Sequence, residues 1–411
     1  MQPKLFTLKN GMRTVLVPCE AESAAFGIFV ASGSRHEPPE LAGISHFIEH
    51  MLFKGSPTRK PIDITRAIEG RGGNFNAWTS EEATCFFAHL PSEYLGEAVD
   101  ILGDMYLNAA LPPDEFAREK RVVIEEIRMY QDEPDSVAAE NLQRAIFPRN
   151  ALGAPVAGSA ATLEGITPQI MHAYISSHYL PEKTVLVVAG AFDEVEALKM
   201  LEKRFPRRRV PKAAFAAQPV DFSVPPVAEV SVSKPEINQS QLALGYRTFG
   251  VCDTRKYAAT VLDAVLGRGM SSRLFQEVRE KRGLSYDISS RWQFFADAGM
   301  FQVAAGLDPA NVDKALATID REIRRVCEKR VSRAELERMK EFLIGNFRLS
   351  HEKVLSKLLY YGSTMLSFGR LVMTAEQVDG VRAVTAEDVM GVAHATFTAA
   401  NRTVSRVVPR A

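Results

Sequence analysis

The sequence predicts an α+β fold of two duplicated domains, each a mostly antiparallel sheet packed with helices. The order of strands and helices found before about residue 205 recurs after residue 227, which indicates a duplication. A proline-rich segment at 207–226 separates the two stretches and is typical of an extended linker. The chain has 411 residues, too long for one ordinary domain. We therefore expect domains at residues 1–206 and 227–411, joined by a linker at 207–226.

In the first half, short apolar runs bounded by turn residues predict strands, and apolar residues at helical spacing predict helices. The expected strands are residues 15–17, 26–30, 74–79, 84–90 and 184–189. The expected helices are 43–53, 61–69, 93–107, 114–130 and one that ends near residue 205. Between residues 131 and 183 we expect looser structure, apart from the approach to the last strand.

In the second half the same order returns. The expected strands are residues 227–232, 241–246, 285–292, 299–305 and 403–408. The expected helices are 254–266, 273–282 and long helices further on, one of which starts at Ser332 with capping-box spacing to Glu335. The helix around Asp263 corresponds to helix 43–53 of the first half. It carries no histidine, so only the first half is expected to bind a metal in the way described below.

Composition narrows the class of protein. The chain is 46% hydrophobic and 24% charged, which is typical of a globular protein with an ample core. Lys+Arg and Asp+Glu both number 50, so neither a nucleic-acid nor a membrane-surface partner is expected. The four cysteines lie far apart and are typical of reduced thiols in an intracellular protein.

The sequence shows neither a secretory signal nor a membrane span. We expect a cytoplasmic location. The alternative is the mitochondrial matrix or the periplasm, after removal of a targeting segment.

Residues 43–53 carry the motif on which the functional prediction depends. His46 and His50 are one helical turn apart, and Glu49 lies on the same side of the helix. Two imidazoles at this spacing can hold one zinc ion, and a neighbouring carboxylate can activate its water. The H-x-x-E-H order is the inverse of the commoner H-E-x-x-H. A pair of capping or core histidines without metal is the alternative, so a third ligand is needed.

The best candidates for the third ligand lie on helix 114–130. Glu119 and Glu126 are seven residues apart and share one helical face, which also carries Val122, Val123 and Met129. We expect this face to point inward and Glu125, about 100° away from Glu126, to meet solvent. Two inward carboxylates are costly unless they meet a cation. Glu126 as ligand and Glu119 as supporting carboxylate would meet this need; two solvated acids on a charged helix are the alternative.

Together these motifs resemble the pitrilysin, insulysin and mitochondrial processing peptidase family of inverted-motif zinc metallopeptidases. The H-x-x-E-H motif is followed some seventy-five residues later by Glu126 within V-I-E-E-I. Residues 76–79 resemble the family's substrate-pairing edge strand, and residues 179–190 resemble a late strand of its first half. Residues 279–286, R-E-K-R-G-L-S-Y, resemble its second-half Arg/Tyr element. The likeness runs from about residue 5 to 405 and points to the short, single-unit type.

The resemblance implies a peptide-hydrolysing enzyme with one zinc ion per chain. Zinc would be held by His46, His50 and Glu126, with Glu49 as general base and Glu119 as supporting residue. The roles implied for the remaining residues are backbone binding of an extended substrate by Asn76 and Ala77, oxyanion stabilisation by Tyr286, and substrate binding by Arg279.

The expected substrates are extended peptides or unfolded polypeptides. In single-chain relatives of double length, two such two-domain units face each other across a chamber. The resemblance therefore implies a homodimer, or a heterodimer with a homologous subunit. The alternative function is a non-catalytic core or assembly subunit of a larger complex. Relatives of that kind typically lose ligands, whereas the full ligand set is present here.

Overall fold

The computed structural model describes residues 2–207 and 216–410, so part of the predicted linker, residues 208–215, lies outside the described residues. The chain forms two compact units. The first comprises Met1–Ile127, Pro155–Gln218 and Arg348–Met373. The second comprises Arg128–Ala154, Pro219–Phe347 and Thr374–Ala411. Helices α4 (Pro113–Asp132) and α11 (Arg333–Ser350) begin in one unit and end in the other.

The first unit is built on a six-stranded sheet in the order β1-β2-β6-β3-β5-β4. Strands β2 and β6 run parallel, and the other neighbouring pairs run antiparallel. Strand β4 stands at one edge of this sheet. The strands are β1 (Lys4–Thr7), β2 (Arg13–Pro18), β3 (Ser23–Val30), β4 (Asn74–Thr79), β5 (Thr84–Pro91) and β6 (Thr184–Gly190).

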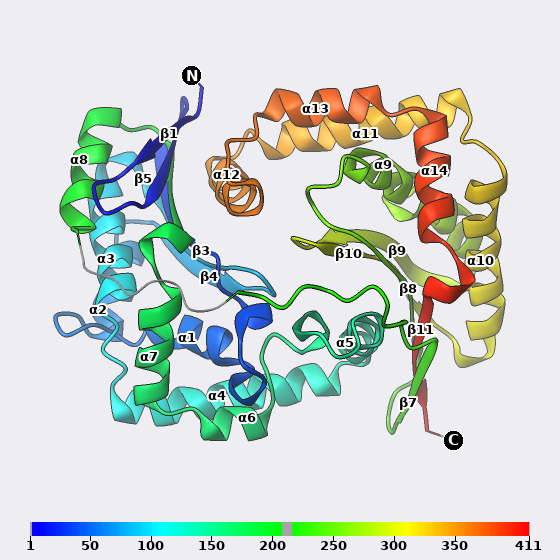
Figure 1. Cartoon of the computed structure of the whole chain (residues 1–411), viewed down its shortest axis with the longest axis horizontal. Helices are drawn as coiled ribbons and strands as arrows, with labels where there is room; N and C mark the ends of the chain where they lie inside the picture. Colours follow the sequence, from blue (N-terminus) through cyan, green and yellow to red (C-terminus); the bar gives the residue numbers. More distant parts are fainter. Residues whose placement is uncertain (1, 208–215, 411) are drawn as a thin grey trace. The chain divides into compact units, whose positions relative to one another are not determined.

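Helices cover both faces of this sheet. Figure 1 shows α3 and α8 together beside the strands, and α12 seen end-on. The helices are α1 (Ile44–Leu52), α2 (Pro61–Glu69), α3 (Leu95–Leu107), α6 (Ala160–Gly165), α7 (Pro168–His178), α8 (Glu194–Arg204) and α12 (Val354–Phe368), with the first part of α4. Two short 3-10 turns, η1 (Ser34–His36) and η2 (Pro39–Leu41), lead into α1.

The alternation of side chains along β3 explains the two covered faces. Phe26 and Ile28 enter a core that also contains Phe47 of α1, whereas Phe29 enters a second core with Leu358 of α12. A Cβ at Gly362 of α12 would lie 2.3 Å from the ring of Phe29, so this glycine permits the helix to approach the sheet closely. The sheet is therefore buried on both sides.

The second unit contains a five-stranded sheet in the order β7-β11-β8-β10-β9. Its strands are β7 (Glu229–Lys234), β8 (Ser240–Phe249), β9 (Ser285–Phe294), β10 (Ala298–Leu307) and β11 (Arg402–Pro409). Its helices are α5 (Pro134–Ile146), α9 (Lys256–Gly267), α10 (Val312–Glu328), α13 (Thr374–Ala383) and α14 (Ala386–Thr396), with most of α11 and a short π-helix, η6 (Phe275–Glu280).

The two sheets share one topology. Each has a parallel pair, β2 with β6 and β7 with β11, followed by three strands in antiparallel order. Strands β6, β3, β5 and β4 therefore correspond to β11, β8, β10 and β9. The predicted α+β fold of two duplicated, mostly antiparallel units is confirmed.

The compact units do not follow the predicted boundaries at residues 206 and 227. Helix α5 precedes the boundary in sequence, yet its Leu142 and Ile146 pack with Ala243 of β8 in the second unit. Helix α12 lies in the second half, yet it covers the first sheet. Each sheet needs a helix on its second face to bury apolar side chains, and in both units that helix comes from the other half of the sequence. Contiguous halves were expected because sequence patterns do not reveal which sheet a helix covers.

One local prediction is wrong, because residues 131–183, expected to be looser, contain the helices α5, α6 and α7. The error arose because α7 has a weakly periodic apolar pattern and α6 is only six residues long. The helix expected at residues 273–282 is present over residues 273–280, and most of it is the π-helix η6.

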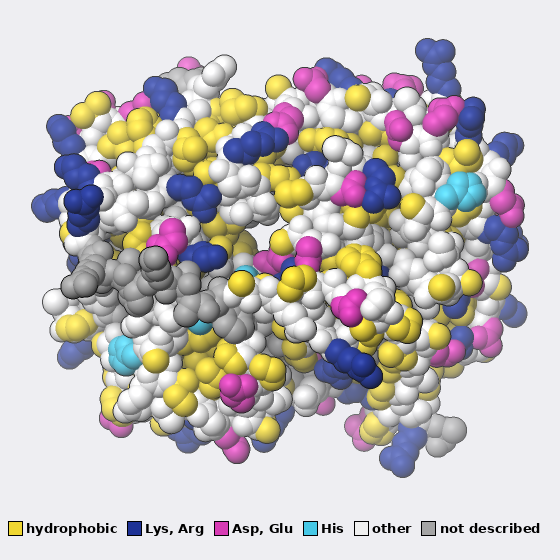
Figure 2. Space-filling view, in the orientation of Figure 1, with side chains coloured by type: hydrophobic (Ala, Val, Ile, Leu, Met, Phe, Trp, Pro, Cys, Tyr) yellow, Lys and Arg dark blue, Asp and Glu magenta, His cyan; other side chains and the backbone are white. Residues whose placement is uncertain are grey.

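The surface shows no dominance of one charge sign on the face drawn in Figure 2, where Lys and Arg side chains are interspersed with Asp and Glu. This agrees with the formal net charge of +0. Among the described residues, no helix is both long and apolar enough to cross a membrane.

The packing of α12 on the first sheet gives a test of this architecture. Leu358 is fully buried there, and its replacement by alanine should lower the free energy of unfolding by about 2–5 kcal/mol, because it leaves a cavity between helix and sheet. Denaturant unfolding measures this change. Leu349→Ala is the matched control, since Leu349 is 62% exposed and should be nearly neutral. Equal effects of the two substitutions would contradict the assignment of α12 to the first unit.

Candidate metal centre

Helix α1 presents two different faces. Its apolar residues Ile44, Phe47, Ile48 and Met51 are fully buried and fix the helix in the core of the first unit. His46 and His50 lie on the other side, with ring centroids 4.8 Å apart. Their side chains are 12% and 22% exposed. The predicted helix and the pairing of its two imidazoles are therefore present in the structure.

Helix α4 brings a carboxylate to the two imidazoles. Glu126 Oε1 lies 3.8 Å from Nε2 of His46, and Glu126 Oε2 lies 3.3 Å from Nε2 of His50. One ligand atom from each of the three residues lies within 4.8 Å of the others. The rings of Phe47 and Phe116 pack at 4.7 Å and join α1 to α4. Two helices far apart in sequence thus aim three donor atoms at one point.

Glu119 stands behind this cluster. Its Oε2 lies 3.1 Å from Nδ1 of His50, and its Oε1 lies 2.6 Å from Nζ of Lys54. With Nδ1–H of His50 donating to this carboxylate, Nε2 is left with a lone pair that faces Glu126. On His46, Nδ1 is buried and has no hydrogen-bond partner in the described part of the chain. Only His50 is therefore oriented by a carboxylate.

The phase of α4 differs in part from the expectation. Glu126 joins the cluster, whereas Glu125 is exposed. Val123 is buried as expected, but Val122 and Met129 are 45% and 49% exposed, so their placement on the inward face was wrong. Each residue turns the helix by about 100°, and the buried stripe follows Val123 and Ile127 rather than their neighbours.

Glu49 is hydrogen-bonded to the hydroxyl group of Thr79 at the end of β4. Thr79 Oγ1 donates to Glu49 Oε2 over 2.6 Å. Burial raises the pKa of Glu49, although the hydrogen bond from Thr79 and the nearby His50 lower it in part. Burial, together with the neighbouring His50, lowers the pKa of His46 to about 4, although the nearby Glu126 raises it in part. At neutral pH His46 is therefore in its neutral, metal-binding form.

Strand β4 presents an unpaired edge in the described structure. Within an antiparallel ladder, alternate residues turn N–H and C=O toward the partner strand. The backbone N–H of Ser80 donates to Ala83 O, so even-numbered residues of β4 face β5. The N–H of Ala77 accordingly points outward, where it donates to Asn76 Oδ1 over 2.8 Å. Phe75, Ala77 and Thr79 thus form the row of outward backbone groups.

The predicted Arg/Tyr pair lies in the second unit. Arg279 belongs to η6 and Tyr286 to β9. The guanidinium carbon of Arg279 lies 4.6 Å from the ring centroid of Tyr286 and 4.7 Å from that of Phe275. Tyr286 is 79% exposed. The structure brings the two predicted residues together in a cation–π contact on the surface of that unit.

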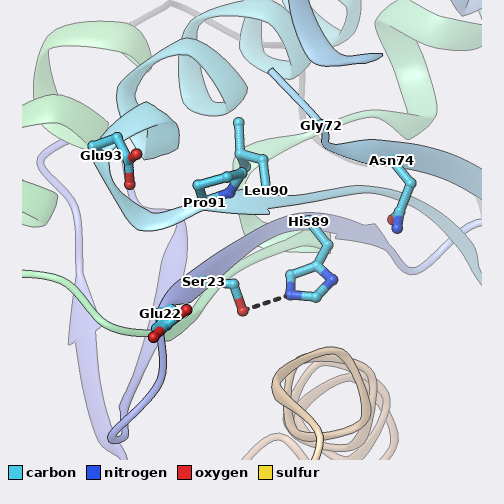
Figure 3. A pocket seen from close by; sticks show the side chains of 8 residues that line it. All are labelled: Glu22, Ser23, Gly72, Asn74, His89, Leu90, Pro91 and Glu93. Carbon is cyan, nitrogen blue, oxygen red and sulfur yellow. Dashed lines mark hydrogen bonds between the residues drawn. The ribbon is translucent and has the colours of Figure 1, made fainter. Parts of the chain in front are cut away.

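A cavity of about 430 Å³ lies at the end of β4 where Asn74 stands, whereas Glu49 is bound at the Thr79 end. Figure 3 shows its lining, with His89 Nε2 and Ser23 Oγ joined by a hydrogen bond of 2.8 Å. None of the residues of the metal cluster lines it. Its lining residues are Glu22, Ser23, Gly72, Asn74, His89, Leu90, Pro91 and Glu93.

The donor set suits a zinc ion. Two imidazole nitrogens and one carboxylate oxygen are the ligands of many catalytic zinc sites, which keep a fourth position open. The contact of His50 with Glu119 follows the usual pattern, in which a ligating histidine donates its second ring N–H to a carboxylate. The converging Nε2 atoms and the partly buried Glu126 are therefore compatible with zinc.

Sequence reasoning missed Thr79 as a partner of Glu49 and Lys54 as a partner of Glu119. Lys54 follows His50 by four residues, just beyond the end of α1 at Leu52, and this proximity in sequence could have been noticed. Nothing local marks Thr79, since its contact depends on how β4 meets α1.

Comparison with known proteins places these features in context. A family model described as insulinase (peptidase family M16) matches residues 14–160, and one described as the peptidase M16 inactive domain matches residues 165–343. An uncharacterized zinc protease of Bacillus subtilis, YmxG, is 35% identical over 396 residues, with 96% of both chains covered. Another, from Mycobacterium leprae, is 34% identical, with 94% of this chain and 88% of the relative covered. The crystal structure of a Helicobacter pylori protease has the same fold, with a TM-score of 0.93, 21% identity and 99% of both chains covered.

The two adjacent acids of α4 give a matched test of the metal cluster. Glu126→Gln should weaken zinc binding by about 100-fold or more, because it removes the charged donor, whereas Glu125→Gln should leave the affinity unchanged. Glu119→Gln should have an intermediate effect of about 10- to 100-fold through His50. Competition titration against a chelator measures all three affinities. Equal losses for Glu125 and Glu126 would contradict this geometry.

Proposed function

Because the chain belongs to the insulinase family of peptidases (family M16), we propose that it is a zinc-dependent endopeptidase that hydrolyses extended peptides or unfolded polypeptides. The single observation that carries the proposal is the cluster of His46, His50 and Glu126, with the carboxylate of Glu49 beside it at the end of an open strand edge. These three residues would hold one zinc ion per chain. When bound, zinc lowers the pKa of a water molecule toward neutrality and polarises a carbonyl group.

Glu49 is the proposed general base. Its Oε2 is held by Thr79, and Oε1 is left to take a proton from the attacking water and to pass it to the leaving amine. Burial raises the pKa of this carboxyl, which makes it a better proton acceptor than an exposed glutamate. Glu119 acts on His50, whose ring it orients.

The open edge of β4 is the proposed binding site for the substrate backbone. An extended peptide would pair with the outward N–H and C=O groups of Phe75, Ala77 and Thr79 by strand addition. It would displace the carboxamide of Asn76 from the N–H of Ala77. Asn76 thus contributes its side chain and Ala77 its backbone. At about 3.3 Å per residue, the six residues of β4 span roughly 20 Å of bound peptide.

Strand addition explains the proposed preference for unfolded substrates. The backbone groups of a folded domain are already paired, so a segment within it has no free edge to offer β4. An extended peptide pays no such cost. Efficient cleavage should therefore be confined to peptides and unfolded chains.

One observation favours the alternative function, a non-catalytic assembly subunit: the second family model is described as an inactive domain. That model covers residues 165–343, which do not contain the cluster. The first half holds two imidazoles, a carboxylate and the partly buried acid Glu49 together, and this argues for catalysis.

Replacing the proposed base tests the mechanism. Glu49→Gln should keep zinc bound, because the three ligands are intact, and should lower turnover by about 10²–10⁴-fold, because proton transfer fails. Zinc content and cleavage of an unfolded peptide library give the two readings. A zinc-loaded Glu49→Gln protein that cleaves as fast as the wild type would exclude Glu49 as the base.

For Arg279 and Tyr286 we propose that they bind the peptide and stabilise the oxyanion at the zinc of a second subunit, as the resemblance implies for a homodimer. Mixing a Glu49→Gln subunit with an Arg279→Ala/Tyr286→Phe subunit should restore roughly a quarter of wild-type activity, because about half the dimers are mixed and each has one intact site. Demonstrated subunit exchange without recovery would reject the shared site. A heterodimer with a homologous subunit would instead leave the chain inactive alone.

A further inference from the structure

We propose that Arg35 and Glu37, two buried ionisable residues outside the metal cluster, are positioning residues that hold the metal-ligand helix α1 and the substrate strand β4 at a fixed separation. The inference rests on the proposed peptidase function, since it assigns a task to residues around that site. Both residues lie in or beside η1, the short turn that precedes α1. They are 3% and 5% exposed.

The backbone of η1 is fastened to the turn between β4 and β5. The N–H of Ser34 donates to Ser80 O over 3.1 Å, and the N–H of Arg35 donates to Glu81 O over 2.7 Å. A Cβ at Gly33 would lie 2.2 Å from Ser80 O, so no other residue permits this approach. The hairpin that carries β4 is therefore held directly by the segment that leads into α1.

The side chain of Arg35 adds a second fastening to the same turn. Its Nη1 lies 2.5 Å from Glu82 Oε1, and its Nη2 donates to the carbonyl of Gln218 over 3.1 Å. The Arg35 side chain is 2% exposed, so the ion pair is largely withdrawn from water on that side. A buried charged hydrogen bond of this kind fixes geometry more firmly than a surface pair does.

Glu37 fastens the segment to α1. Its Oε2 accepts from the N–H of Gly43 and its Oε1 from the N–H of Ser45, both over 2.7 Å. Gly43 is the N-cap of α1 and Ser45 lies in its first turn, where the N–H groups have no partner within the helix. A carboxylate there is also favoured by the helix dipole. His46 follows Ser45 directly, so Glu37 sets the position of the first metal ligand.

These contacts close a ring around the site. Arg35 binds the hairpin that carries β4, and Glu37, two residues further on, binds the start of α1. The hydrogen bond from Thr79 to Glu49 then joins α1 to β4 and completes the ring. A shift of β4 against α1 would stretch the 2.6 Å bond of Glu49 and move a bound peptide away from the base. A misplacement of about 1 Å can cost about 100-fold in rate. We therefore assign this closed set of contacts the task of keeping a bound substrate at a fixed distance from the base.

Glu82 is the best place to test this, because it is partly exposed and belongs to the hairpin rather than to α1. In Glu82→Ala, turnover per zinc-loaded site should fall at least about tenfold, and mass spectrometry should show new cleavage at bonds next to the preferred one. Glu82→Gln, which keeps a neutral acceptor, should fall between this variant and the wild type. Glu97→Ala is the matched control, since it breaks the exposed ion pair with Arg71 and should change neither quantity. A lower unfolding temperature with unchanged turnover per site and cleavage pattern would show that Arg35 is merely structural.

Hydrogen exchange tests the coupling without using activity. In Glu82→Ala, amides at the start of α1 should exchange faster than in the wild type, although Glu82 lies on the hairpin. In Glu37→Gln, which loses one of two acceptors, amides of β4 should exchange faster, whereas the exposed control Glu40→Gln should have no effect. Faster exchange confined to the mutated element would overturn the proposal. If the zinc-loaded wild type cleaves no peptide, the proposed function fails and this measurement still decides whether α1 and β4 are coupled.

Discussion

The contact of the Glu126 carboxylate with two imidazoles is the interaction on which the first unit depends. Glu119, the second inward acid of α4, is balanced by Lys54, so its charge is met within the protein. Glu126 converges with His46 and His50 in the cluster, and the pKa of His46 is lowered by burial, so that ring stays neutral at physiological pH. A carboxylate beside two imidazoles is a set of donors that suits a divalent cation.

Such a cluster requires a rigid support, and the support explains much of the local structure. Helix α1 has one face fully buried, which leaves no freedom to rotate about its axis. The ring contact of Phe47 with Phe116 ties α1 to α4, and Glu37 fixes the first turn. The same helix also carries Glu49, which is bonded to Thr79 of β4. The proposed metal ligands, base and substrate edge are therefore positioned by one short helix and its immediate neighbours.

Periodicity predicted the parts of this arrangement that depend on a single element. Helix α1 with its paired histidines, strand β4 and the inward position of Glu126 were predicted in this way and are present in the structure, whereas the edge position of β4 was implied by the family resemblance. Periodicity failed where the answer depends on which surfaces meet. The burial of Arg35 against a distant hairpin and the exchange of α5 and α12 between sheets are contacts across long stretches of sequence. Val122 was misplaced because a helical face inferred from spacing is wider than the stripe that tertiary packing buries.

The duplicated unit shows why the fold alone does not determine the site. Helix α9 occupies the place of α1 beside the second sheet, and its Asp263 is fully buried. That carboxylate accepts hydrogen bonds from Arg268 Nε over 2.5 Å and from Ser290 Oγ over 2.6 Å, so it is paired by residues of the same unit. A Cβ at Gly267 would lie 2.4 Å from Ser290 Oγ, which shows how closely strand and helix meet there. In one copy the buried acid is paired by the protein and stabilises packing; in the other, Glu126 meets two imidazoles in a cluster that is compatible with zinc. The same architecture thus supports an internal ion pair or a cluster of metal-binding side chains, and the difference lies in the few residues placed beside each sheet.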